Sequence, residues 1–171
     1  MATLKDKLDA FDGQPEQEWN KRKGISVGER GQVYRANFSQ EYMSAVYAID
    51  GGIIKDYDIV KCDKLVLLDL DNQTLFELFV ELKGANIQHA IKQVEATLKN
   101  PLFKDSAVKK REARIVGRKI PSNTGNSITE IAKKNFISRY NCRLEFKTGP
   151  AVENIKICYL YLSNKYVSGK R

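Results

Sequence analysis

Two acidic residues and a lysine in the middle of the chain have the types and spacing needed for metal-dependent hydrolysis. Asp63 lies in a first apolar run, residues 57–70 (YDIVKCDKLVLLDL), and Glu81 and Lys83 end a second, residues 74–84 (TLFELFVELKG). Two carboxylates that meet repel each other unless a cation lies between them, and oxygen ligands favour Mg²⁺ or Mn²⁺ over zinc. The cation would acidify a water molecule and polarise a phosphodiester. The lysine would orient or deprotonate that water, or stabilise charge on the phosphate.

The two apolar runs must pair in one register to bring these side chains together. The turn signal Asp71-Asn72-Gln73 between them predicts a β-hairpin. With a three-residue loop, Leu70 pairs with Thr74, and counting back along both strands places Asp63 opposite Glu81. The lysine two residues after Glu81 shares its face, because side chains alternate along a strand. A two-residue loop would turn Asp63 to the wrong face, unless a bulge restored the register.

Most E-x-K sequences in strands are surface pairs of little consequence. Here Glu81 and Lys83 follow a long apolar run, where an unpaired charge is costly, and this context favours a site. Among the rival aspartates, Asp58 is the second choice after Asp63. Asp69 and Asp71 are typical of turn residues.

The chain carries Asp63, then 17 intervening residues, and then Glu81-Leu82-Lys83-Gly84 before an amphipathic helix. This arrangement resembles the PD-(D/E)xK nucleases, the restriction-endonuclease-like superfamily. The resemblance implies an α/β fold, a mixed β-sheet flanked by helices with a restriction-endonuclease-like core. It implies a Mg²⁺- or Mn²⁺-dependent nuclease that hydrolyses phosphodiester bonds in nucleic acid, DNA rather than RNA.

The same resemblance implies a role for each matching residue. Asp63 and Glu81 correspond to the metal ligands and Lys83 to the catalytic lysine, while Gln93 resembles the glutamine that many members carry on the following helix. Some members add an acidic residue from a first helix. Glu41 is the best-placed candidate for this further ligand, and Glu29 is the competing choice.

The rest of the chain predicts helices and strands in alternation within a single domain, residues 1–171. Residues 1–23 are polar and form a candidate peripheral N-terminal arm, a short helix followed by a loop. Residues 39–49 place apolar side chains at helical spacing, with Ser39 as N-cap. The remaining predictions are a helix over 85–100, a strand over 113–121, a helix over 128–140 with Ile128, Ile131, Phe136 and Ile137 inward, and strands over 142–147 and 155–162, the last central.

The charge is unevenly distributed along the chain. Residues 1–103 hold 13 Lys or Arg against 16 Asp or Glu, a net charge of −3, and residues 104–171 hold 16 against 5, a net of +11, which together give +8. Such asymmetry favours a polyanionic partner, and nucleic acid above all. The residues expected to contact phosphates are Lys109, Lys110, Arg111, Arg114, Arg118 and Lys119, with the loop 122–127 beside them. The alternative is a solvated edge strand protected by charge.

Composition restricts the remaining classes of function. With 42% hydrophobic and 29% charged residues, the chain has the balance of a soluble globular protein. It has no apolar run of about 18 residues and no apolar core of signal-peptide type at its start, which predicts a cytoplasmic protein that does not enter a membrane. Three distant cysteines and a single histidine, His89, argue against a Cys/His zinc site and against triads without His89.

Three functions remain open on sequence alone. The first is a metal-dependent nuclease, which could act as a homodimer. The second is a catalytically inactive member of the same fold that serves as a nucleic-acid-binding or assembly subunit, although the intact Asp63, Glu81 and Lys83 argue against it. The third is an unrelated α/β binding module in which the Glu-Leu-Lys sequence is a surface feature.

Overall fold

The computed structural model describes residues 13–83, 85–104, 108–121 and 127–157, together with Asp6 and Leu8. The side chain of Lys109, residues 122–126 of the basic loop and residues 158–162 of the expected last strand lie outside this part. The elements are β1 (Gln17–Glu29), β2 (Gln32–Ala48), β3 (Lys64–Asp69), β4 (Leu75–Leu82), α2 (Ile87–Lys99), a short 3₁₀ helix (Pro101–Phe103), β5 (Val108–Gly117), α3 (Ile128–Tyr140), β6 (Cys142–Thr148) and β7 (Ala151–Ile155).

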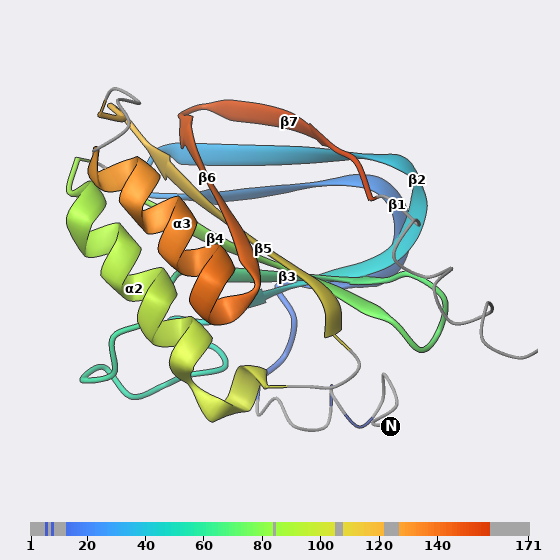
Figure 1. Ribbon diagram of the computed structural model, residues 1–171. Coiled ribbons are helices and arrows are strands. Elements are labelled where there is room, and N and C mark those ends of the chain that lie inside the picture. Colours follow the sequence, from blue (N-terminus) through green and yellow to red (C-terminus); the bar gives the residue numbers. More distant parts are fainter. Residues whose placement is uncertain are drawn as a thin grey trace, which may run out of the picture.

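A mixed β-sheet with two helices forms the protein, as the predicted α/β class requires. The strand order is β1-β2-β3-β4-β5-β6, and β7 pairs with β2. Strands β1 to β4 are antiparallel neighbours, whereas β4, β5 and β6 are parallel and are connected through α2 and α3 (Figure 1). Within the described part of the chain, no helix is long and apolar enough to cross a membrane.

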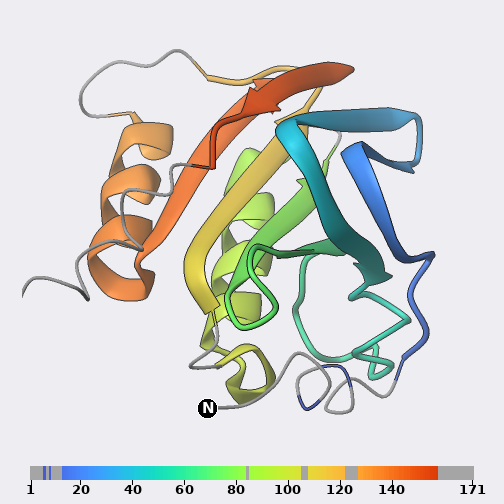
Figure 2. The same cartoon turned by 90° about the vertical axis from the view of Figure 1, so that its right-hand side faces the viewer.

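Both faces of the central strands are covered, by different elements. The two helices pack on one face through a core that includes Leu65, Phe79 and Val94. On the other face, β2 curves and carries β1 and β7 over the sheet, enclosing a second core that includes Val27, Tyr34 and Leu78 (Figures 1 and 2). Consecutive residues of β3 and β4 are therefore buried, and their apolar runs show no alternation of burial.

The helix predicted over residues 39–49 is wrong, and the arm predicted over residues 1–23 is wrong from Gln17 onward. Residues 39–49 belong mostly to β2 and do not form a helix, and β1 begins at Gln17 inside the segment expected to be an arm. The sequence was misleading because residues 44–47 of β2 are all buried, so the strand shows no two-residue period there. The register between β1 and β2 also shifts between Arg22 and Gly24, where β2 curves.

Further along the chain the predictions are closer. The helices over 85–100 and 128–140 and the strand over 142–147 are confirmed, while the strand expected over 113–121 runs from Val108 to Gly117. The prediction of which residues of α3 (Ile128–Tyr140) face inward is wrong in part. Phe136 is buried, but Ile128, Ile131 and Ile137 are exposed, because this helix packs through the stripe that also carries Thr129 and Ala132.

Candidate functional site

The β3–β4 hairpin has the register that places Asp63 opposite Glu81. The backbone pairs run from Asp69–Leu75 to Lys64–Val80, and the Leu70 N–H donates to the Thr74 carbonyl at 2.9 Å. The prediction of a three-residue loop is therefore confirmed, although both strands are shorter than expected. Asp63 lies just before β3, on the face that α2 covers.

The carboxylates of Asp63 and Glu81 are held by backbone amides of the opposite strand. Glu81 Oε2 accepts a hydrogen bond from the Asp63 N–H at 3.1 Å, and Asp63 Oδ2 accepts one from the Leu82 N–H at 2.7 Å. Asp63 is 8% exposed and Glu81 is 1% exposed. The two acids are thus fixed beside each other in a poorly solvated place.

This burial disfavours the ionised form of both carboxyl groups. The pKa of Asp63 is raised to about 6, chiefly by burial; the negative charge of Glu29 contributes to the rise, and the hydrogen bond from the Leu82 amide opposes it. The pKa of Glu81 is raised to about 8, first by burial and then by the negative charge of Asp63, while the Lys83 ammonium opposes the rise. Burial and the neighbouring carboxylates disfavour the anionic form of both groups, and a cation bound between them would favour it.

Helix α2 holds the lysine beside this pair. The Lys83 ammonium donates to Gln93 Oε1 at 3.1 Å, and Gln93 Nε2 donates to the Lys61 carbonyl at 3.0 Å. Thr97, one turn further, accepts from the Cys62 N–H at 2.8 Å. The structure therefore brings four predicted site residues, Asp63, Glu81, Lys83 and Gln93, to one side of the hairpin.

A further acidic residue comes from the β1–β2 turn. Glu29 Oε2 lies 3.8 Å from Lys64 Nζ, and its charge contributes to the raised pKa of both Asp63 and Glu81. Arg30 and Gly31 form the turn with positive φ angles of 47° and 78°, as a two-residue hairpin requires. This Arg-Gly turn is the signal that could have placed Glu29 at a hairpin tip.

The first choice for that role, Glu41, is not brought to the site. It lies on β2 seven residues before Ala48, the residue that pairs with Lys64 beside Asp63. The expectation of a metal ligand at Glu41 is therefore wrong. That expectation assumed a helix over residues 39–49. This segment instead belongs to strand β2, whose end nearest the site is Ala48.

The basic segment divides into internal and exposed residues. Arg114 is 2% exposed and contacts Glu153 at 2.7 Å and Glu112 at 2.6 Å. Arg111 contacts Glu77 at 2.9 Å. Their expected phosphate contacts are wrong, because both guanidinium groups are committed to internal carboxylates. Lys110 is also paired, with Glu112 at 3.1 Å.

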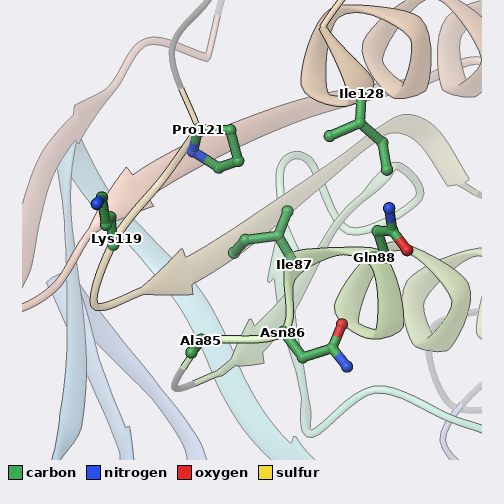
Figure 3. A pocket seen from close by; sticks show the side chains of 7 residues that line it. All are labelled: Ala85, Asn86, Ile87, Gln88, Lys119, Pro121 and Ile128. Atoms are coloured by element: carbon green, nitrogen blue, oxygen red, sulfur yellow. The ribbon is translucent and has the colours of Figure 1, made fainter.

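Arg118 and Lys119 are different, because both are exposed just after the end of β5. The Lys83 N–H donates to the Val116 carbonyl at 2.7 Å, which sets the end of β5 beside the strand that carries the site. A pocket opens there at the start of α2. It is lined by Ala85, Asn86, Ile87, Gln88, Lys119, Pro121 and Ile128 (Figure 3).

Comparison with known proteins finds no family model, no curated protein and no solved structure that matches this chain. Among the described residues, no group of three His, Cys, Asp or Glu is arranged to hold a metal ion. The carboxylate pair still fits Mg²⁺, which keeps several waters and is usually bound by one or two carboxylates together with substrate phosphates.

Proposed function

We propose that the protein is a metal-dependent nuclease with a restriction-endonuclease-like core. The observation that supports this most strongly is the buried Asp63–Glu81 pair with the Lys83–Gln93 hydrogen bond beside it. Buried acids with raised pKa values beside a lysine are found frequently at functional sites. The order of the hairpin, the following helix and a parallel strand agrees with the core that the sequence resemblance implies.

In this proposal Asp63 and Glu81 hold a Mg²⁺ or Mn²⁺ ion and Glu29 lies next to them. When bound, the ion would supply an acidified water and polarise the scissile phosphate. Gln93 fixes the Lys83 ammonium on the same side. From there Lys83 orients the attacking water and stabilises the negative charge that grows on the phosphate.

The proposed substrate is nucleic acid, with DNA favoured over RNA. The net charge of +8 attracts a polyanion, and Arg118 and Lys119 offer exposed positive charges at the end of β5 beside the site. A cytoplasmic location and a homodimer are further parts of this proposal. The second candidate is a non-catalytic nucleic-acid-binding or assembly subunit, which the same positive charges would equally favour.

The deciding experiment is single-turnover cleavage of a mixed set of labelled DNA and RNA substrates with Mg²⁺ or Mn²⁺. We expect cleavage that EDTA abolishes and that Lys83→Ala lowers strongly. Lys92→Ala, an exposed lysine on α2, serves as the matched control and should cut at the wild-type rate. Binding without cleavage at any metal concentration would support the non-catalytic alternative, and cleavage that persists in EDTA would end the nuclease proposal.

A further inference from the structure

The loop between β2 and β3, which leads into Asp63, presents apolar side chains to solvent. Tyr57 is 89% exposed, Ile59 is 43% exposed and Val60 is 49% exposed. Single exposed apolar residues are common, but three within four residues of one loop are more typical of a contact surface. The loop projects from the sheet beside α2 (Figure 1).

The loop is held in shape from within. The Lys61 side chain is buried, and its ammonium donates to the Asp56 carbonyl at 2.6 Å and to the Ile59 carbonyl at 3.0 Å. The Asp56 carboxylate accepts from the Asp58 N–H at 2.9 Å. Tyr57 therefore stands on a closed turn, and less conformational entropy is lost when a partner binds it.

The same loop is tied directly to the catalytic candidates. The Lys61 carbonyl accepts from Gln93, the residue that also binds Lys83. Five residues lie between Tyr57 and Asp63, so the two Cα atoms lie at most about 22 Å apart even along an extended chain. A strand whose phosphate lay between Asp63 and Glu81 would have its neighbouring nucleotides within reach of this loop.

The charges around Tyr57 favour a base over a phosphate. Asp56 and Asp58 flank the tyrosine, and both are exposed. Their negative charges disfavour the sugar–phosphate backbone at the tip of the loop, whereas the face of a neutral base stacks on an aromatic ring without regard to its sequence. A base can offer its face only where it is unstacked, as in a single strand, a flap or a frayed end.

We propose that Tyr57 is a base-stacking residue, supported by Ile59 and Val60, that directs the protein to nucleic acid with unpaired bases next to the cleaved phosphate. This inference rests on the proposed nuclease function and specifies the class of its substrate. Tyr57 contacts a flanking nucleotide and takes no part in the chemistry.

The test compares Tyr57→Ala, Tyr57→Phe and a control, Ile137→Ala, which removes an exposed apolar side chain from α3. The affinities for a fluorescent single-stranded oligonucleotide and for the blunt duplex of the same sequence are measured with Ca²⁺ in place of Mg²⁺. We expect Tyr57→Ala to weaken single-strand binding by about 5- to 150-fold. Tyr57→Phe and Ile137→Ala should bind like the wild type, and duplex affinity should change less than about twofold.

The outcomes separate this inference from the nuclease proposal. If the wild type cuts nucleic acid but Tyr57→Ala binds the single strand normally, or weakens both substrates equally, base stacking at Tyr57 is wrong and the nuclease proposal stands. If the wild type never cuts and Tyr57→Ala still loses single-strand binding selectively, the nuclease proposal is wrong and Tyr57 remains a stacking residue. Absence of both binding and cleavage would overturn both.

Discussion

Asp63 and Glu81 extend the β3–β4 ladder beyond its last backbone pair through their own carboxylates. Lys64 and Val80 form that last pair, and the next two hydrogen bonds run from the Asp63 N–H to Glu81 and from the Leu82 N–H to Asp63. The amide oxygen of asparagine or glutamine can accept the same hydrogen bonds. Asn or Gln at these positions therefore removes charge while keeping the hairpin, and these variants are informative probes.

The first prediction concerns stability against pH without metal. The pKa of Asp63 is raised from 3.8 to about 6 and that of Glu81 from 4.5 to about 8. In this window the folded state holds more protons than the unfolded state, so the contribution of the pair is greatest below about pH 4 and is lost as the pH rises through 6 and 8. We expect the urea concentration at the unfolding midpoint, measured in EDTA, to decrease when the pH is raised from 5 to 9.

Glu81→Gln should flatten this dependence because it removes the group with the higher pKa. At pH 9 the variant should be more stable than the wild type by about 1–3 kcal/mol, and at pH 5 the two should differ little. Urea titrations at the two pH values test this. A variant that is less stable than the wild type at pH 9 would show that the ionised pair is already compensated in the folded protein.

The second prediction concerns metal binding. Mn²⁺ should raise the melting temperature of the wild type, because it binds the folded carboxylate pair and not the unfolded chain. Glu81→Gln and Asp63→Asn should lose this shift and lose cleavage, whereas Lys83→Ala should keep the shift, since an ammonium is not a ligand. Calorimetric titration with Mn²⁺ measures each case, and equal Mn²⁺ affinity in wild type and Glu81→Gln would place the ion elsewhere.

The third prediction assigns Gln93 as a positioning residue for Lys83. Gln93→Ala removes the acceptor of the Lys83 ammonium, and we expect single-turnover cleavage to fall about 10- to 100-fold, because misplaced groups lose much of their effect. Mn²⁺ affinity should stay within about twofold of the wild type. Lys92→Ala, exposed on the same helix, is the control. A loss of Mn²⁺ binding in Gln93→Ala would point to a general collapse of the site.

The fourth prediction separates exposed from internal basic residues. The double variant Arg118→Ala, Lys119→Ala should weaken binding of nucleic acid. It should also reduce the slope of log K against log salt by about one for each phosphate that the protein no longer neutralises. The charge-matched control is the double variant Lys99→Ala, Arg143→Ala, whose side chains are 60% and 64% exposed. An unchanged slope in the first variant would exclude this edge as the contact surface.

The fifth prediction concerns Arg114, which the sequence placed among the phosphate contacts. Arg114→Ala removes the buried guanidinium that pairs with Glu112 and Glu153, and we expect it to lower the free energy of unfolding by about 3–5 kcal/mol. Denaturant titration measures the decrease. Phosphate affinity of the remaining folded protein should be normal, and a selective loss of affinity without loss of stability would restore Arg114 as a phosphate-binding residue.

Local patterns in the sequence determined the hairpin and the helix that carry the site. The turn Asp71-Asn72-Gln73 and the parity of Asp63 and Glu81 specify a register, and the helical spacing of Ile87, Ala90, Val94 and Leu98 specifies α2. These features depend on neighbours in the chain. The hairpin register and the helix can therefore be predicted from residue spacing without knowledge of the fold.

Only the tertiary structure decided which basic side chains are exposed to a partner and which further acidic residue lies near Asp63 and Glu81. Arg114 alternates in its strand like a solvent-facing residue, yet β7 covers it with Glu153. Glu29 approaches Asp63 and Glu81 because β2 curves and returns the β1–β2 turn over the sheet, a path that the register shift near Lys23 accompanies. Burial by a distant strand leaves no period in the sequence, since it depends on contacts between segments more than 30 residues apart.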